Sequence, residues 1–287
     1  PHLTDKSIQY IDSKAKNRKP FFLYFALPAP HTPILPTTEF LGLSNTNFYG
    51  DFVLQVDDVV GKIVSTLEKH GIRNSTMVLF ASDNGCSPRA DFEELKKVGH
   101  NPSYIFRGSK ADIYEGGHRV PFIVSWPDKI KKGQLSDEII CTTDILATIA
   151  EITGYKLQDN AGEDSYSFLP VMTGKNLKSP LREATVHHSV QGRFAIRQGQ
   201  WKLILCPGSG GWSFPRTKEE LENLPKFQLY NLSNDPSELN NVVEKFPDKV
   251  AHLKKLLTKY ISEGRSTPGK PQKNEGMNNW TEIDILF

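Results

Sequence analysis

Two short apolar runs, separated by a long amphipathic segment, most constrain how this chain can fold. Residues 21–26 and 77–81 are continuously apolar, without the alternation typical of a half-exposed strand. Between them, residues 50–71 repeat apolar side chains at spacings of three and four and end at a glycine, as amphipathic helices do. This order of strand, helix and strand predicts an α/β fold: a mostly parallel sheet with helices on both faces.

The pattern changes near residue 180, where short strands and glycine turns replace the longer elements. Residues 185–188, 193–197, 201–205 and 227–230 are expected to form a small antiparallel sheet, with a helix over 249–262 packed on it. We expect three parts in the chain: an α/β part over 1–178, the small sheet with its helix over 179–263, and a flexible tail over 264–287. Further helices are expected over 4–16 and 142–153, and a further strand over 120–126.

Composition excludes several classes of protein. Among the 287 residues, 38% are apolar and 24% are charged, which favours a folded core over a disordered chain. The formal net charge is only +2, so the clustered basic excess of a nucleic-acid-binding protein is missing, and we expect no nucleic-acid partner. No apolar run is long enough to span a membrane. Three cysteines are too few for a disulfide framework.

Polar residues follow both apolar runs. Asp83 and Asn84 come directly after the second run, and His31 lies in a proline-rich loop after the first. Ligands of α/β sheets bind outside the carboxyl ends of the strands, and paired oxygen donors suit Ca²⁺ or Mg²⁺. An ordinary turn explains Asp83 and Asn84 equally well from spacing alone, and a solvated loop histidine is the simpler explanation of His31.

Three further residues are candidates for binding. Lys110 precedes a pair of glycines and has the charge to contact an anion, although alone it is one of many lysines. His187 and His188 are neighbours on an expected strand, so their side chains face opposite ways. One of the two could contact a sugar; one packed and one solvated histidine is an equally good interpretation.

In this order and spacing, the motifs resemble the sulfatase family of the alkaline phosphatase superfamily. The resemblance covers nearly the whole chain and implies an alkaline-phosphatase-like fold. The sheet after residue 180 and the Cys206–Trp212 loop are similar to arylsulfatase-type enzymes that act on sulfated sugars. The matching segments are His-Thr-Pro at 31–33, Tyr-Gly-Asp at 49–51, Ser-Asp-Asn-Gly at 82–85, Lys110, and Tyr-Glu-Gly-Gly-His-Arg-Val-Pro at 114–121.

The resemblance implies a role for each matching residue. Asp83 and Asn84 would be ligands of Ca²⁺, with Mg²⁺ as the alternative. His31 and Lys110 would be catalytic and would contact the sulfate and its bridging oxygen. The substrate would be a small-molecule or oligosaccharide sulfate ester. By the same resemblance the protein is expected to be periplasmic or secreted, although this chain has no signal peptide. The oligomeric state is left open.

The nucleophile of the family has no match. Sulfatases use formylglycine, made from the first residue of Cys/Ser-x-Pro-x-Arg, and one similar stretch here, starting at Cys86, has Ala90 in place of the arginine. In the family, this motif and the other metal ligands precede the loop that carries His31. We therefore expect a C-terminal portion of a sulfatase, inactive by itself, with formylglycine in the full-length protein. Apolar surface should then be exposed on 21–26 and 77–81.

Two alternatives remain open at this stage. A phosphoester or phosphonate hydrolase of the same superfamily would share the metal chemistry and differ near the nucleophile. A non-catalytic binding protein on the same scaffold would keep the fold and show no turnover.

Overall fold

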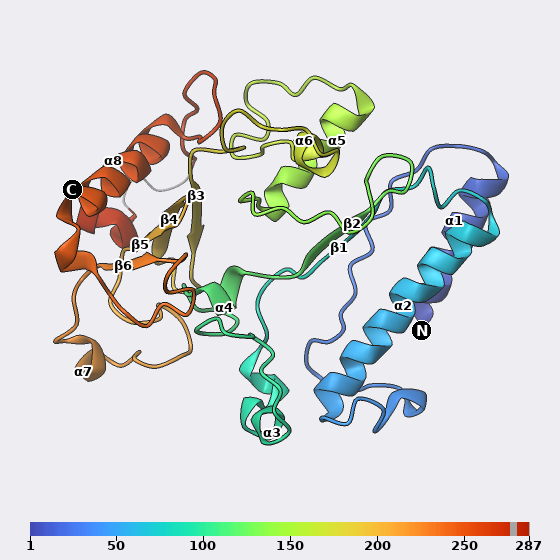
Figure 1. Cartoon of the computed structure of the whole chain (residues 1–287), viewed down its shortest axis with the longest axis horizontal. Helices are drawn as coiled ribbons and strands as arrows, with labels where there is room; N and C mark the ends of the chain where they lie inside the picture. The colour runs from blue at the N-terminus through green and yellow to red at the C-terminus, as the bar shows by residue number, and fades with distance from the viewer. Residues whose placement is uncertain (276–279, 287) are drawn as a thin grey trace. The chain divides into compact units, whose positions relative to one another are not determined.

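The computed structural model describes residues 1–275 and 280–286, which form two compact units (Figure 1). The chain passes between the units more than once, so neither is a continuous stretch. Unit 1 consists of Pro1–Ala81, Cys86–Pro102 and Phe122–Lys132. Unit 2 consists of Ser82–Gly85, Ser103–Pro121 and the described residues from Gly133 onward.

Unit 1 is built on two helices that lie side by side (Figure 1). Ile11 and Leu67 are almost fully buried, and His70 Nε2 lies 2.5 Å from Asp12 Oδ1, which joins the C-terminal end of the longer helix to the shorter one. The longer helix begins at Asn47, whose side chain accepts backbone hydrogen bonds of the first turn. The elements of unit 1 are α1 (His2–Lys16), α2 (Phe48–Lys69), β1 (Val78–Ala81), α3 (Phe92–Lys97) and β2 (Phe122–Ser125), with 3₁₀ turns at Thr38–Phe40 and Pro88–Ala90.

The described residues of unit 1 form a two-stranded antiparallel sheet instead of the expected parallel sheet. Strands β1 and β2 pair antiparallel, with Val78 opposite Ser125 and Ala81 opposite Phe122. The strand prediction for residues 21–26 is wrong: the segment is not a strand and belongs to neither sheet of the described residues.

Apolar surface is exposed on the segment that fails to form a strand. Phe22 is 64% exposed and Tyr24 is 82% exposed. On β2, Ile123 is 60% exposed. The expectation of exposed apolar side chains is therefore confirmed for residues 21–26, whereas residues 77–81 are half-buried.

Unit 2 contains a four-stranded antiparallel sheet in the order β3-β4-β5-β6. The four strands and the long closing helix were all predicted from the sequence, and their observed ends agree to within two residues. The elements of unit 2 are α4 (Glu115–His118), α5 (Ile145–Thr153), α6 (Leu169–Met172), β3 (Thr185–His188), β4 (Phe194–Gln198), β5 (Trp201–Ile204), α7 (Lys218–Leu221), β6 (Gln228–Asn231) and α8 (Pro247–Glu263), with 3₁₀ turns at Thr142–Asp144, Val243–Lys245 and Thr281–Leu286.

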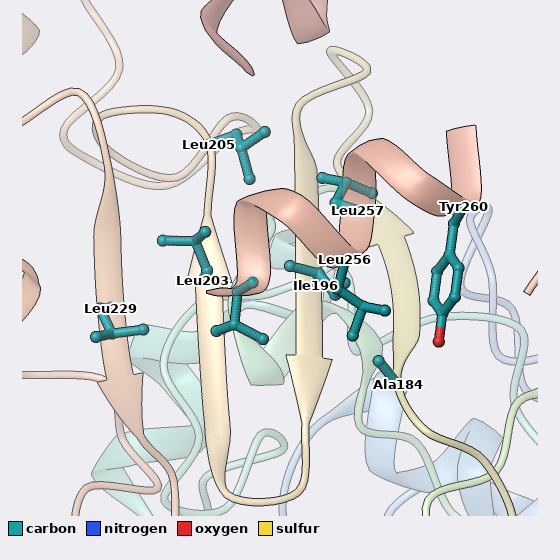
Figure 2. Close-up of a cluster of buried hydrophobic side chains, with 9 residues drawn as sticks. Ala184, Ile196, Leu203, Leu205, Leu229, Leu256, Leu257 and Tyr260 are labelled. Atoms are coloured by element: carbon teal, nitrogen blue, oxygen red, sulfur yellow. The ribbon is translucent and has the colours of Figure 1, made fainter. Parts of the chain in front are cut away.

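One face of this sheet packs against α8. Ile196 and Leu203 point from neighbouring strands toward Leu256 and Leu257 of the helix (Figure 2). All four side chains are at most 6% exposed. Each buried leucine or isoleucine contributes roughly 1.5–3 kcal/mol through the hydrophobic effect, so this layer fixes the helix on the sheet.

The opposite face of the sheet packs against the segment that leads into α4. Ala195, Ile204 and Tyr230 form a second buried cluster with Ile113 and Tyr114. Strand alternation separates the two clusters, because successive residues of a strand point to opposite faces. The sheet thereby positions residues 113–118, which carry the glycine pair noted in the sequence.

The segment after α8 is partly held in place. Arg265 is 6% exposed, and its guanidinium donates to the carbonyls of Asp159, Pro268 and Lys270. Residues 276–279 and 287 of the predicted tail lie outside the described residues, and the division at 178 and 263 stays a prediction. No described helix is both long and apolar enough to cross a membrane.

Candidate active site

The glycine pair Gly116-Gly117 of α4 lies directly against the segment that follows β1. The Gly85 N–H donates to the Gly117 carbonyl at 3.0 Å. A Cβ added to Gly85 would lie 1.7 Å from the Gly116 carbonyl oxygen, so a side chain has no room between the two backbones. We call Gly85, Gly116 and Gly117 the glycine hub. The hub fixes Asp83 and Asn84 beside α4.

The segment that carries Lys110 packs on the same hub. The Gly116 N–H donates to the Arg107 carbonyl at 2.8 Å, and a Cβ added to Gly117 would lie 2.3 Å from the Asp112 carbonyl oxygen. Two segments that are separate in sequence, 82–85 and 107–112, are therefore joined through one turn. The backbone segments that carry Asp83, Asn84 and Lys110 meet at this turn, and that their side chains form one site stays a prediction.

Asp112 holds the loop around Lys110 in shape. Its carboxylate is fully buried and accepts hydrogen bonds from Ser109 N–H at 2.8 Å, Trp212 N–H at 2.8 Å and Ser213 N–H at 2.9 Å. The Ser213 hydroxyl donates to the same carboxylate. Backbone donors from two loops thus converge on one side chain, which fixes the residues on both sides of Lys110.

A buried ionic cluster fixes α4 from the other direction. Lys202 is fully buried, and its ammonium lies 3.1 Å from Glu115 Oε1 and 2.9 Å from Glu238 Oε1. Glu238 also accepts the Glu115 backbone N–H at 2.6 Å, at the first turn of α4. We call Glu115, Lys202 and Glu238 the ionic cluster. Removing one member would leave an uncompensated buried charge, at a cost of about 3–5 kcal/mol.

The two carboxyl groups of the ionic cluster respond differently to burial. Burial raises the pKa of Glu115, but the nearby charges of Lys202, Arg197 and Arg119 outweigh it and hold that pKa below its usual value. Burial dominates for Glu238, and its pKa is raised even though Lys202 favours the charged form. The cluster therefore has a carboxylate that stays ionised beside one that is more easily protonated.

Strand register explains why these groups meet on one face. Arg197 pairs with Lys202, and Lys202 pairs with Tyr230, so all three point to the same side of the sheet. His187 pairs with Ala195, two residues before Arg197, and so shares that side. The face that packs on the residues before α4 therefore also presents His187.

His187 and His118 lie against each other beside the hub. Their rings are 4.3 Å apart, and His187 Nε2 lies 3.4 Å from the Ile113 carbonyl oxygen. Burial, reinforced by the charge of Lys202, lowers the pKa of His118 to about 4 and that of His187 well below its usual value. Both imidazoles are consequently neutral at pH 7.

His188 does not share this position. It is exposed, its ring lies 5.9 Å from that of Phe194, and its Nδ1 lies 3.2 Å from the Ser189 carbonyl oxygen. Strand alternation places it on the α8 side of the sheet, opposite His187. The structure thus separates the two histidines, as their adjacent positions on a strand require.

Asp83 and Asn84 offer oxygen atoms of the kind that Ca²⁺ and Mg²⁺ prefer. Asp83 is exposed, and Asn84 Nδ2 donates to the Gly85 carbonyl at 3.0 Å, which leaves Oδ1 as the amide atom available to a cation. The Ser82 hydroxyl donates to the Asn84 carbonyl at 2.8 Å and steadies the turn. The donor types fit a hard cation; within the described residues, no group of three or more His, Cys, Asp or Glu completes a shell.

The remaining predicted residue, His31, belongs to unit 1. It is exposed, and its Nδ1 lies 2.8 Å from the Thr32 carbonyl oxygen. Asp83, Asn84, Lys110 and His187 all belong to unit 2. The approach of His31 to Lys110 therefore stays a prediction.

Sequence reasoning missed the residues that support the site. The sequence does contain a feature that could have identified Lys202 as buried and paired. A lysine between apolar strand residues needs a buried acidic partner unless its side chain leaves the core. The corresponding feature for Asp112 is weaker. An aspartate three residues after a serine is typical of a turn in which the aspartate side chain accepts a backbone hydrogen bond. Glu238 lies in a loop after β6, and no sequence feature identified it.

Two family descriptions match this chain. The sulfatase family description matches residues 2–155, and that of N-sulphoglucosamine sulphohydrolase, C-terminal, matches residues 109–266. An N-acetylgalactosamine-6-O-sulfatase of Bacteroides thetaiotaomicron is 38% identical over 265 residues, covering 89% of this chain and 49% of its own length. The mouse N-acetylgalactosamine-6-sulfatase is 29% identical, covering 96% of this chain and 55% of its own length.

A solved structure from work on glycosaminoglycan metabolism by Bacteroides thetaiotaomicron has the same fold. It superposes with a TM-score of 0.77 at 37% identity and covers 89% of this chain and 53% of its own length. The chain spans about half the length of the curated relatives it matches. The predicted alkaline-phosphatase-like α/β class is thereby confirmed. The sulfatase family description matches more than half of this chain, and the 38% identical relative covers 89% of it. The chain therefore belongs to the sulfatase family.

Proposed function

We propose that the protein hydrolyses sulfate esters on sulfated carbohydrate. The observation that supports the proposal is the glycine hub, through which the backbone segment of Asp83 and Asn84 contacts the segment of Lys110. Relatives named as N-acetylgalactosamine-6-sulfatases support a sulfated amino sugar as the substrate class.

Each residue of the site has a distinct role in this proposal. The ammonium of Lys110 binds the sulfate group and offsets negative charge that develops at the bridging oxygen. His31 supplies a proton to the sugar oxygen as its bond to sulfur breaks, so that the sugar leaves as an alcohol. Asp83 and Asn84 hold a divalent cation, Ca²⁺ in most of the family, which polarises the sulfate oxygens when bound.

His187 is the better of the two candidate sugar contacts. It shares the face of the sheet that packs beside the hub, and its neutral imidazole can exchange hydrogen bonds with a sugar hydroxyl. His188 is on the opposite face, and we retain it only as an alternative contact.

The nucleophile in this proposal is the family's formylglycine. The 287 residues contain no complete Cys/Ser-x-Pro-x-Arg motif, so we expect them to show no sulfatase turnover by themselves and the full-length protein to be active. We propose a periplasmic or secreted location on family resemblance alone.

Lys110→Ala tests the proposed sulfate contact. In the full-length enzyme, kcat for a 6-sulfated N-acetylgalactosamine substrate should fall by about 10²–10³-fold, because a charge aimed at the reacting group is lost. Lys178→Ala, at an exposed lysine of unit 2, is the matched control and should leave kcat unchanged. An unchanged rate for Lys110→Ala would remove this residue from the site.

Asp83→Ala tests the proposed cation site with a readout besides activity. Adding Ca²⁺ to the metal-stripped full-length protein should raise its Tm, because an ion that binds only the folded state stabilises it. The Ca²⁺-dependent rise should disappear in Asp83→Ala and persist in Asp137→Ala, whose carboxylate is also exposed. A full Ca²⁺ response in Asp83→Ala would contradict the assignment.

The same preparations discriminate between the alternatives. Turnover of a phosphate monoester in preference to the sulfate ester would favour a phosphoester hydrolase. Binding of sulfated sugar without turnover of either ester would favour a non-catalytic protein on the sulfatase scaffold.

A further inference from the structure

Unit 2 contains a small cavity lined by three cationic side chains and one carboxylate. Its volume is about 170 Å³, smaller than the roughly 300–1,000 Å³ of pockets that enclose a drug-sized ligand, so it suits one substituent of a larger molecule. Arg193, Arg216 and Lys226 line it, with Glu282 as the single carboxylate among the lining residues. We call this space the basic cavity.

Within the described residues, Arg193 and Lys226 form no ion pair with a carboxylate, whereas the charge of Arg216 helps to lower the pKa of nearby Glu220. Arg216 donates to the Trp212 carbonyl at 3.0 Å, a contact that orients its side chain without neutralising it. Positive charge is therefore left over in the cavity.

The floor of the cavity supplies no compensating anion. Cys206 is 3% exposed, and burial raises the pKa of its thiol to about 12 although the charge of Arg193 opposes the shift. The thiol is neutral at pH 7. Leu205 and Pro207 add further apolar lining, while Arg216 and Lys226 are exposed to solvent.

The basic cavity adjoins the loop that carries Lys110. Gly211 lines the cavity, and a Cβ added to it would lie 2.4 Å from the carbonyl oxygen of Ala111, the residue after Lys110. The Ile113 N–H also donates to the Ser209 carbonyl at 2.9 Å. One loop, residues 205–216, thus forms a wall of the cavity and supports the proposed sulfate-binding lysine.

We infer that the basic cavity binds a second anionic group of the substrate, a carboxylate or sulfate on a neighbouring sugar. Arginine matches both groups because its planar fork can donate two parallel hydrogen bonds to them. The inference rests on the proposed function for its substrate and adds to it a preference for acidic oligosaccharides over monosaccharides.

Arg193→Ala in the full-length enzyme tests the inference. KM for a chondroitin 6-sulfate tetrasaccharide should rise about tenfold, because a charge-assisted hydrogen bond is lost, while kcat and the kinetics on 6-sulfated N-acetylgalactosamine stay unchanged. Lys218→Ala, at an exposed lysine that does not line the cavity, is the matched control. Equal losses on both substrates, or unchanged KM for the tetrasaccharide, would overturn the inference.

A binding measurement separates failure of the inference from failure of the proposed function. Calorimetry uses full-length protein with unsulfated chondroitin tetrasaccharide, which carries only carboxylates, and with carboxyl-reduced chondroitin 6-sulfate, which carries only sulfates. If Arg193→Ala weakens the binding of either probe about tenfold, the result supports anion binding in the basic cavity even if no ester is hydrolysed. The probe whose binding weakens identifies the group as a carboxylate or a sulfate. Binding of both probes with no dependence on Arg193 would overturn it.

Discussion

At the scale of single residues, the most consequential side chains are buried ones that support the site without touching a substrate in our proposal. Asp112 gathers donors from two loops around Lys110, and Lys202 lies between Glu115 and Glu238. Such fully partnered charges specify one arrangement, because any other leaves a charge buried and unpaired.

Asp112→Asn should impair catalysis through the position of Lys110. The amide replaces one acceptor oxygen with a donor that opposes the surrounding N–H groups, so the loop should shift. In the full-length enzyme we expect kcat to fall about 10–100-fold, with KM for the sulfated substrate changed less, as measured by steady-state kinetics.

Asp58→Asn is the control for this substitution, because Asp58 forms an exposed i,i+4 pair with Lys62 that contributes little to stability. A Tm loss in Asp112→Asn with normal kcat in the folded fraction would mean that Asp112 is structural only. Equal kinetic effects of the two substitutions would also rule out its positioning role.

At the scale of elements, local pattern predicted the type of most helices and strands. Residues 185–188 were expected as a strand and form β3, and the apolar spacing over 249–262 corresponds to α8 at Pro247–Glu263. Residues 21–26 carry an equally strong apolar signal and form no strand. A strand needs a neighbour for its hydrogen bonds, and the local sequence cannot supply one.

Leu257→Ala should loosen α8 from the sheet. Leu257 is 1% exposed in the cluster with Ile196 and Leu203, so its truncation leaves a cavity and should lower the free energy of unfolding by about 2–5 kcal/mol. Urea unfolding of the full-length protein, followed by circular dichroism, measures the loss.

Lys255→Ala on the exposed side of α8 is the matched control, with an expected change within about 0.5 kcal/mol. Because Leu257 is on the opposite face of the sheet from the hub, kcat at low temperature should remain near normal. A stability change as small as that of the control would show that the α8 layer is not a main source of stability.

At the scale of the whole molecule, the neutral histidines make stability depend on pH. The folded-state pKa of His118 is about 4, below the value of about 6.5 in an unfolded chain, and that of His187 is also lowered. Between these pH values the unfolded state binds more protons than the folded state. Stability from these groups is therefore complete above pH 6.5 and is lost as the pH falls toward 4.

His118→Asn should reduce this pH dependence. The Asn amide keeps a donor near the position of Nδ1 and does not titrate. We expect the free energy of unfolding of the full-length protein to fall less between pH 6.5 and 4 in the variant, by on the order of 2 kcal/mol, as measured by urea titrations at each pH. Parallel profiles for the two proteins would contradict the assigned state of His118.

The sequence by itself determined most of the element types, the strand-end motif at Asp83 and Asn84, and the family resemblance, because these depend on short-range spacing and residue chemistry. Only the tertiary structure decided which of these residues meet. Lys202 pairs with Glu115, which lies 87 positions earlier in the sequence. The three glycines of the hub bring two loops that are distant in sequence to one turn. Such contacts depend on strand register and on burial, which arise when distant segments pack together and cannot be inferred from the spacing within either segment.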